Sequence, residues 1–374
     1  MIPPASKKIR VLIVDDSAFM RKVLESILNA DVLIQVAGHA KDGREAIALA
    51  ESLKPDVITM DINMPVMDGL QATAEIMSAN PRPIVIVSSE SRQGAASALR
   101  ALELGAIDFV SKPTGGIDLD MQSVREELIR KVRMAAKVRV VRTASRPPSA
   151  AKINPSEPAA APFASGRAPT SVDLAQRFPV VVIAASTGGP ATVMRLAPSF
   201  TRDFPAAVIL VQHMPAAFTT QFAAQLAEFT DIRVKEAEVN EFLLPGTFYV
   251  CPGGQHLRVA SSGRIHLDAT TGRIHGYLPN IDLAMESVAA YAGPMSVGVV
   301  LTGMGNDGAS GARAIKAAGG TVFAQDEATS VIFGMPAEAI KAQAVEQVLG
   351  IDEIYGALEK YVLSIAKPAT AGVR

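Results

Sequence analysis

The chain has 374 residues, of which 49% are hydrophobic and 20% charged, so it is long enough for two globular domains and too apolar to be disordered. Its net charge of -1 gives no electrostatic argument for a nucleic-acid partner. Cys251 is the single cysteine and no apolar run approaches the roughly 18 residues that span a bilayer, so we expect a cytoplasmic protein without disulfides or membrane insertion.

Residues 1–138 alternate between strand-like and helix-like segments. Short apolar runs indicate buried strands, and apolar residues at helical spacing indicate the helices between them. This alternation predicts a five-stranded, doubly wound parallel sheet with helices on both faces. The predicted strands are residues 9–14, 34–40, 57–60, 84–87 and 107–110, and the predicted helices are residues 18–28, 44–52, 71–78 and 95–104.

Charged and hydroxyl side chains follow the ends of these strands. Asp15 and Asp16 come directly after the first strand, Asp61 follows the third, Ser88 ends the fourth and Lys112 follows the fifth. Carboxylates crowded at one sheet edge repel one another unless a cation lies among them, and oxygen ligands of this kind suit Mg²⁺. Taken singly, Asp16 is explained as a helix cap and Lys112 as a surface lysine, but their joint placement favours a site for phosphoryl chemistry.

Residues 139–178 lose the periodicity and contain recurrent prolines, which is typical of a linker. In the stretch just before, residues 125–146, cationic side chains outnumber acidic ones. We interpret that stretch as a solvated helix face, and the alternative is a docking strip for an acidic partner.

Residues 179–374 predict a second, mostly parallel α/β domain. Residues 256–278 alternate like short antiparallel strands that turn near Ser262. The other predicted strands are residues 180–183, 208–211, 248–251, 297–301 and 321–324, and the predicted helices are residues 190–196, 219–228, 281–291, 309–318 and 352–366.

Three of these strands lead into residues with complementary chemistry. Ser186 follows the strand 180–183, His213 follows the strand 208–211, and Asp307 follows a glycine-rich turn after a third strand. Because the carboxyl ends of parallel strands meet at one edge of a sheet, we expect a hydroxyl, an imidazole and a carboxylate to converge there. These are the nucleophile, the base and the orienting acid of acyl transfer.

Each of these residues also has a plainer explanation. Ser186 or Asp307 alone is explained as a helix cap, and the glycines after Ser186 as a phosphate-binding turn, although the Gly-x-Gly-x-x-Gly spacing is absent. Asp326 is the rival carboxylate. The chain order Ser, His, Asp and the lack of Gly-x-Ser-x-Gly around Ser186 argue against an α/β-hydrolase fold.

Residues 9–130 resemble a response-regulator receiver domain, with Asp61 at the position of the phospho-acceptor aspartate. The resemblance implies that Asp15, Asp16, Asp61 and the backbone carbonyl of Asn63 hold Mg²⁺. It also implies that Ser88, Phe109 and Lys112 respond to phosphorylation.

The segments Ala185-Ser186-Thr187-Gly188-Gly189-Pro190, Gln212-His213-Met214-Pro215 and Thr302-Gly303-Met304-Gly305-Asn306-Asp307-Gly308, with residues 324–336, resemble the CheB family of chemotaxis protein-glutamate methylesterases. The resemblance implies a cofactor-free Ser186–His213–Asp307 esterase and glutamine deamidase, with an oxyanion site near the backbone of Thr187 and Met304. Its substrates would be cytoplasmic helices of transmembrane chemoreceptors. A histidine kinase would phosphorylate Asp61, and the unphosphorylated receiver would cover the active site.

Two other functions remain open from the sequence. One is a phosphorylation-controlled binding module in which the three residues are inert, and the other is a receiver-linked hydrolase of small esters. A transcriptional output is disfavoured because no basic helix-turn-helix pattern follows the linker.

Overall fold

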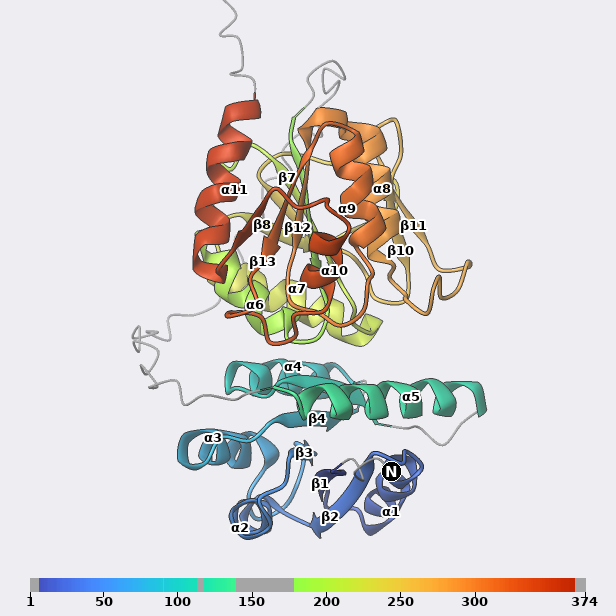
Figure 1. The fold of residues 1–374 in the computed structure, drawn as a ribbon, viewed down its shortest axis with the longest axis vertical. Coiled ribbons are helices and arrows are strands. Elements are labelled where there is room, and N and C mark those ends of the chain that lie inside the picture. Colours follow the sequence, from blue (N-terminus) through green and yellow to red (C-terminus); the bar gives the residue numbers. More distant parts are fainter. Residues whose placement is uncertain (1–6, 90, 113–117, 139–177, 367–374) are drawn as a thin grey trace, which may run out of the picture.

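The structure is a computed structural model that describes residues 7–89, 91–112, 118–138 and 178–366 (Figure 1). The predicted linker, residues 139–178, lies outside the described residues except for Phe178, and the domain limits at 138 and 179 stay predictions. Among the described residues, no helix is both long enough and apolar enough to cross a membrane.

The first domain consists of alternating strands and helices. Its five strands pair in parallel, which confirms the predicted doubly wound sheet. The elements are β1 (Ile9–Val14), α1 (Ala18–Asn29), β2 (Ile34–Ala40), α2 (Gly43–Leu53), β3 (Val57–Met60), α3 (Gly69–Ala79), β4 (Ile84–Ser88), α4 (Arg92–Glu103), β5 (Asp108–Ser111) and α5 (Asp118–Ala135). The strand order is β2-β1-β3-β4-β5.

The second domain is built on a seven-stranded sheet in which every pairing is parallel. Its strands are β6 (Val180–Ala185), β7 (Ala207–Gln212), β8 (Arg233–Glu236), β9 (Thr247–Val250), β12 (Ser296–Val300), β13 (Thr321–Gln325) and β14 (Gln347–Leu349), in the order β14-β13-β12-β6-β7-β9-β8. The predicted hairpin is the separate antiparallel pair β10 (His256–Val259) and β11 (Ile265–Asp268).

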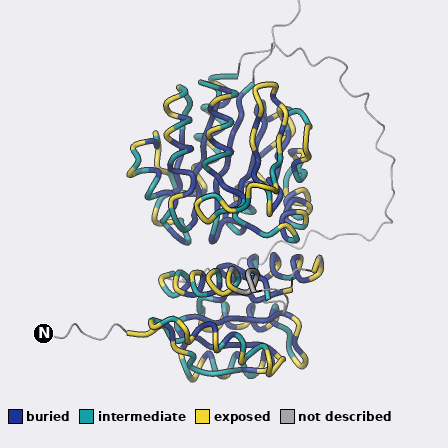
Figure 2. The backbone as a smooth tube through the Cα atoms, turned by 90° about the vertical axis from the view of Figure 1, so that its right-hand side faces the viewer, coloured by how far each residue is buried: buried dark blue, intermediate teal, exposed yellow. Residues whose placement is uncertain are grey.

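Helices cover both faces of the second sheet. They are α6 (Gly189–Leu196), α7 (Ala216–Phe229), α8 (Ile281–Ala292), α9 (Ala309–Ala317), α10 (Met335–Lys341) and α11 (Ile351–Ile365), with short 3-10 turns at Ala197–Ser199 and Gly293–Met295. Because strand side chains alternate, Val181 and Ile183 of β6 pack in the cluster of α6, α7 and α11, whereas Val180 and Val182 pack in the cluster of α8, α9 and α10. Figure 2 shows buried residues along the strands of both sheets.

The two domains are in apolar contact with each other. In Figure 1, α4 and α5 of the first domain face the second domain, and α4 packs against α7 and α6. Phe109 of β5 is stacked on Phe218 of α7, with ring centroids 4.2 Å apart and 17° between the ring planes. Both side chains are buried, so the apolar core is continuous from one domain to the other.

Candidate active site

The site lies where the second sheet reverses its strand order. The chain leaves β6 toward β7 on one side and returns to β12 on the other, and ligands of parallel sheets bind at the carboxyl ends of strands at such a switch point. Ser186 directly follows β6, His213 directly follows β7, and Asp307 lies in the turn between β12 and α9. The register of the strands therefore brings three distant parts of the chain together.

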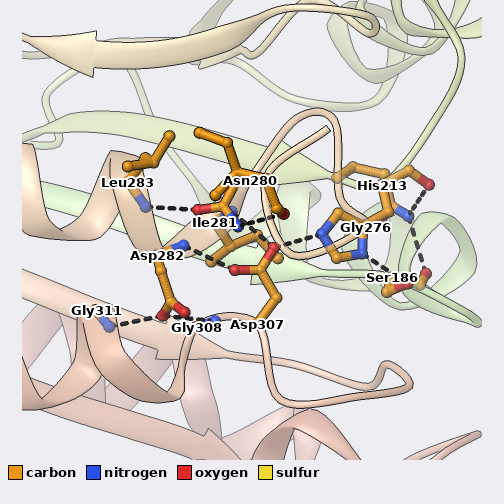
Figure 3. Close-up of polar contacts among 12 residues, drawn as sticks. Ser186, His213, Gly276, Asn280, Ile281, Asp282, Leu283, Asp307, Gly308 and Gly311 are labelled. Carbon is orange, nitrogen blue, oxygen red and sulfur yellow. Dashed lines mark hydrogen bonds and ion pairs between the residues drawn. The ribbon is translucent and has the colours of Figure 1, made fainter. Parts of the chain in front are cut away.

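The three side chains form one hydrogen-bonded chain (Figure 3). Ser186 Oγ lies 3.1 Å from His213 Nδ1, and His213 Nε2 lies 2.8 Å from Asp307 Oδ2. With the proton on Nε2 donated to Asp307, the lone pair of Nδ1 faces the serine hydroxyl. This arrangement can take the proton of Ser186 and stabilise the resulting imidazolium.

Asp307 is held by the start of α8. Its carboxylate is buried and accepts hydrogen bonds from the backbone N–H groups of Ile281 (2.8 Å) and Asp282 (2.9 Å). A carboxylate at a helix N-terminus is stabilised by the helix dipole as well as by these bonds. These hydrogen bonds fix the direction in which the Asp307 carboxylate faces His213.

The alternative explanations of the sequence fit the structure poorly. The residues that cap α6 and α9 are Gly188 and Gly308, and neither cap has a side-chain hydrogen bond, so Ser186 and Asp307 do not cap the helices that follow them. The rival Asp326 accepts hydrogen bonds from Thr329 in its own turn.

Residues that the sequence reasoning did not single out support the loops of the site. Gln212 Nε2 donates to the carbonyl oxygens of Ser186 (2.9 Å) and His213 (3.2 Å), tying the two loops together. Gln325 Oε1 accepts from Thr302 N–H at 2.8 Å and so anchors the start of the turn that carries Asp307. Gly303 must lack a side chain, because a Cβ there would lie 2.8 Å from Ser186 Cβ.

A cavity of about 270 Å³ opens beside Ser186 and His213. Thr187 and Met304, the predicted oxyanion residues, line it, as do Met214 and Tyr277. Part of its wall belongs to the first domain, where the lining residues are Asp108, Ser111, Val124, Glu127, Arg130 and Lys131. The receiver therefore covers the candidate active site in this arrangement.

The predicted acidic site is assembled at the end of the first sheet. Carboxylate oxygens of Asp15, Asp16 and Asp61 lie within 4.8 Å of one another. Lys112 Nζ forms ion pairs with Asp15 (2.9 Å) and Asp61 (2.8 Å). Asn63 follows two residues after Asp61 and is exposed. The Ser88 hydroxyl, at the end of β4, donates a hydrogen bond to the carbonyl oxygen of Gly94 at 3.1 Å.

The charges at this site influence one another. Burial raises the pKa of Asp61, against the opposing effect of Lys112. Burial alone would lower the pKa of Lys112, but its hydrogen bonds to Asp15 and Asp61 raise that pKa above the usual range. Crowded carboxylate oxygens are the donor set of a hard divalent cation, so the residues present fit Mg²⁺.

Cys251 and His256 are structural. Cys251 is fully buried, and burial raises the pKa of its thiol, as expected for an inert cysteine. His256 lies in a polar, glycine-rich stretch of sequence but is also buried. Its Nδ1 accepts from Asn280 N–H at 3.1 Å and its Nε2 lies 2.6 Å from the carbonyl oxygen of Gly272, so it supports the loop that leads into α8.

The chain is similar to known proteins over nearly its whole length. The family profile described as CheB methylesterase matches residues 181–358, and the one described as response regulator receiver domain matches residues 11–124. The protein-glutamate methylesterase/protein-glutamine glutaminase of Pyrococcus horikoshii is 42% identical over 363 residues, covering 94% of this chain and 93% of the relative. The protein of the same name from Symbiobacterium thermophilum is 42% identical over 359 residues, covering 95% and 98%.

Two solved structures from Thermotoga maritima match the two domains separately. The CheB methylesterase catalytic domain is 37% identical, with a TM-score of 0.48, and the match covers 49% of this chain and 98% of that chain. The response regulator domain of CheB is 49% identical, with a TM-score of 0.33, and the match covers 36% and 99%. With two relatives 42% identical over at least 94% of its length, the chain belongs to the CheB family of protein-glutamate methylesterases/protein-glutamine glutaminases.

Proposed function

We propose that this protein is a phosphorylation-controlled protein-glutamate methylesterase that also deamidates glutamine side chains. Its substrates would be glutamyl methyl esters on the cytoplasmic helices of transmembrane chemoreceptors, and it would act in the cytoplasm. The observation that carries the proposal is the unbroken hydrogen-bonded chain from Ser186 through His213 to Asp307. The family of the chain supports the substrate class.

The first half-reaction transfers the acyl group to the enzyme. Ser186 Oγ attacks the γ-carbonyl carbon of the ester while its proton passes to His213 Nδ1. When the tetrahedral intermediate collapses, the carbon–oxygen bond to the methoxy group breaks and His213 returns the proton to that oxygen. Methanol leaves, and the glutamyl group remains esterified to Ser186.

The second half-reaction frees the enzyme. His213 takes a proton from a water molecule, whose oxygen attacks the acyl carbon, and the bond to Ser186 Oγ then breaks as His213 reprotonates it. The product is a glutamate carboxylate. A glutamine substrate follows the same path, with ammonia as the first leaving group.

Backbone N–H groups near Thr187 and Met304 would bind the oxyanion of both intermediates. Both residues line the cavity beside Ser186, which supports this assignment. Such donors act where charge develops in a site sheltered from water, and the loss of one costs on the order of 3 kcal/mol of transition-state stabilisation.

Control would come from the first domain. Asp61 would accept a phosphoryl group from a histidine kinase, with Asp15, Asp16, Asp61 and the Asn63 carbonyl holding Mg²⁺, which when bound neutralises phosphate charge. The added negative charge would draw the Ser88 hydroxyl toward Asp61, with which Lys112 is already paired, and shift Phe109, the residue stacked on the second domain. The covering domain would then separate from the hydrolytic site.

Methanol release from methylated receptor membranes, with and without a small-molecule phosphodonor, tests this function. The wild type should release methanol faster with the phosphodonor. Ser186→Ala should release none while Asp61 is still phosphorylated, because the nucleophile is absent and the receiver is intact. Asp61→Asn should keep the slow, unstimulated rate.

The other functions predict different results. Binding of receptor without any methanol release by the wild type would indicate a binding module. Cleavage of soluble acyl esters as fast as receptor esters would indicate a hydrolase of small esters. Residual ester cleavage by Ser186→Ala would contradict the assignment of the nucleophile.

A further inference from the structure

Tyr277 lies against the face of the His213 imidazole. The two ring centroids are 4.6 Å apart and the ring planes differ by 14°, which is a stacked arrangement. Ser186 and Asp307 hold two edges of the same imidazole through its two nitrogens. The hydrogen bonds restrain the ring within its own plane, and Tyr277 restrains it against tilting out of that plane.

The Tyr277 ring is presented by a tight turn with firm anchors. Ile274 and Tyr277 exchange two backbone hydrogen bonds of 3.0 Å, and His275 and Gly276 between them have positive φ angles of 50° and 87°. Three residues further on, Asn280 donates its N–H to the buried His256 and caps α8 through Leu283 N–H. The position of the ring is therefore determined by backbone structure on both sides.

The Tyr277 hydroxyl reaches the turn on the opposite side of the site. It lies near the backbone of Asn306, the residue before Asp307, which partly offsets the rise in the pKa of the phenol. It also packs on Gly305, where φ is +92° and a Cβ would lie 2.1 Å from the hydroxyl oxygen. One side chain thus connects the base to the turn that carries Met304 and Asp307.

The electrostatics favour a neutral phenol. Burial, and after it the nearby Asp307 carboxylate, raise the pKa of Tyr277, so this hydroxyl neither donates its proton to substrate nor carries charge in the working range. The ring face of a neutral phenol is electron-rich, and it attracts the imidazolium that forms when His213 takes the serine proton. The attraction is greatest when the charge is present, which is in the transition states.

We propose that Tyr277 is a positioning residue of the hydrolytic site, which holds the plane of His213 and stabilises its protonated form. This inference rests on the proposed esterase function. The Tyr277 hydroxyl has a smaller role, which is to pack against the turn of Gly305 and Asn306.

Two substitutions in the full-length protein separate these parts. Tyr277→Phe keeps the stacked ring and loses only the hydroxyl, whereas Tyr277→Leu loses both. His275→Asn is the matched control, because His275 is an exposed residue of the same turn and asparagine tolerates its positive φ. The phosphodonor is kept at saturation so that release of the receiver does not limit the rate.

With methylated receptor membranes as substrate, Tyr277→Leu should lower kcat about 10-fold and change KM less than about 2-fold, because the lost attraction acts on the charged imidazole. Tyr277→Phe should restore kcat to within about 5-fold of the wild type, because the ring stacked on His213 is kept and only one polar group is lost. A Tyr277→Leu enzyme with wild-type kcat would overturn the inference. A rise in KM alone would overturn it too, because Tyr277 would then bind substrate.

A spectroscopic measurement separates this inference from the proposed function. The ring current of Tyr277 should shift the His213 ring protons upfield in NMR spectra of the wild type and Tyr277→Phe, and the shift should vanish in Tyr277→Leu. His213→Gln identifies the signals. If the shift behaves in this way but no variant releases methanol, the stacked pair stands and the esterase function fails. An unshifted wild-type signal would refute the stacked pair itself.

Discussion

Lys131 is a buried cation on the receiver wall of the hydrolytic cavity. Its side chain is 9% exposed, and its Nζ donates to Asp108 Oδ1 (2.9 Å), Glu127 Oε1 (3.0 Å) and the carbonyl of Phe109 (2.6 Å). Three acceptors match the three protons of an ammonium group. The prediction that residues 125–146 form a solvated helix face is therefore wrong at Lys131. The partners of Lys131 lie on β5 as well as on α5, so its side chain points into the protein.

Glu127 should make stability depend on acid pH. Burial opposes its ionisation, but Lys131 lowers the pKa of Glu127 below its usual 4.5, so the ionised form is favoured in the folded state. The contribution of ionised Glu127 to the free energy of unfolding is therefore complete above its pKa in the unfolded state. It is lost as pH falls through its pKa in the folded state. Relative to Glu127→Gln, the wild type should be about 1 kcal/mol more stable near neutral pH.

Urea unfolding of the wild type and Glu127→Gln at a series of pH values measures this difference. The gap between the two proteins should close below about pH 4.5, where the unfolded wild type takes up its proton first. A gap that stays constant down to the acid limit would show that Glu127 contributes through packing and not through its charge.

At the scale of single residues, the sequence predicted the groups that follow apolar strands. The sequence predicts that Ser186, His213 and Asp307 converge, because each comes after a run whose burial is evident and parallel strands end at a common edge; the structure brings the three side chains within hydrogen-bonding distance. No sequence pattern marks Tyr277 and Gln325 as site residues. Tyr277 contacts His213 and Gln325 contacts Thr302 only because a turn and a neighbouring strand fold back onto the site, and the spacing of apolar residues carries no information about such folding.

The helices α8 and α9 hold each other by their N-termini. Asp307, just before α9, accepts from Ile281 and Asp282 at the start of α8. In return, Asp282 Oδ1 accepts from Gly308 (2.9 Å) and Gly311 (2.7 Å) at the start of α9, as Figure 3 shows. The orientation of Asp307 therefore depends on the partner helix as well as on its own turn.

These reciprocal hydrogen bonds predict that two substitutions of Asp282 differ in their effects. Asp282→Ala should lose about 1–2 kcal/mol of unfolding free energy, the scale of an N-cap, and should lower kcat about 10-fold as Asp307 loosens. Asp282→Asn should retain both, because a single amide oxygen can replace Oδ1. Burial, and with it the repulsion of Asp307, raises the pKa of Asp282, so removal of the charge costs nothing in stability.

Denaturant unfolding together with methanol release at saturating phosphodonor checks both variants. If Asp282→Asn were as damaged as Asp282→Ala, the charge of Asp282 would matter more than its hydrogen bonds. If Asp282→Ala lost stability but kept kcat, the two helix ends would be coupled in folding only.

At the scale of elements, the predicted strands and helices agree with the structure to within a few residues wherever the apolar pattern was strong. The missed strands, β8 and β14, lie at the two edges of the second sheet. β8 reads Arg-Val-Lys-Glu and is partly exposed, since edge strands carry charges, and so it lacks the apolar run that marks a central strand. Helix α10, only seven residues long, was missed because Pro336 obscures its start.

The sequence pattern does not predict the contact between the domains, because nothing local marks Phe109 and Phe218 as neighbours. Only the family resemblance implies that the receiver covers the site. Their stack, with the Glu103–Gln225 hydrogen bond and the packing of α4 on α7, closes the first domain over the cavity. Such contacts join residues more than a hundred positions apart in sequence.

Loss of the aromatic stack should activate the unphosphorylated enzyme. Phe218→Leu keeps most of the apolar volume but removes an aromatic pair worth about 1 kcal/mol, so methanol release without phosphodonor should rise about 5-fold. Stimulation by phosphodonor should shrink by a similar factor. Phe200→Leu, which alters an aromatic cluster within the second domain, is the matched control.

Both rates are measured on receptor membranes after thermal melts show that each variant is folded. An unchanged basal rate in Phe218→Leu would mean that the stack does not hold the domains together. An equal rise in Phe200→Leu would assign the effect to general loosening of the second domain.

The cavity beside Ser186 takes its walls from two domains, and this has a pharmacological consequence. A small molecule that fills it touches both walls only while they are together, so it binds the resting protein more tightly than the activated one. By thermodynamic reciprocity, phosphorylation must weaken such an inhibitor by the same factor by which the inhibitor opposes activation. Compounds of this kind would inhibit the residual activity of the unphosphorylated enzyme and would dissociate more readily once the receiver is phosphorylated.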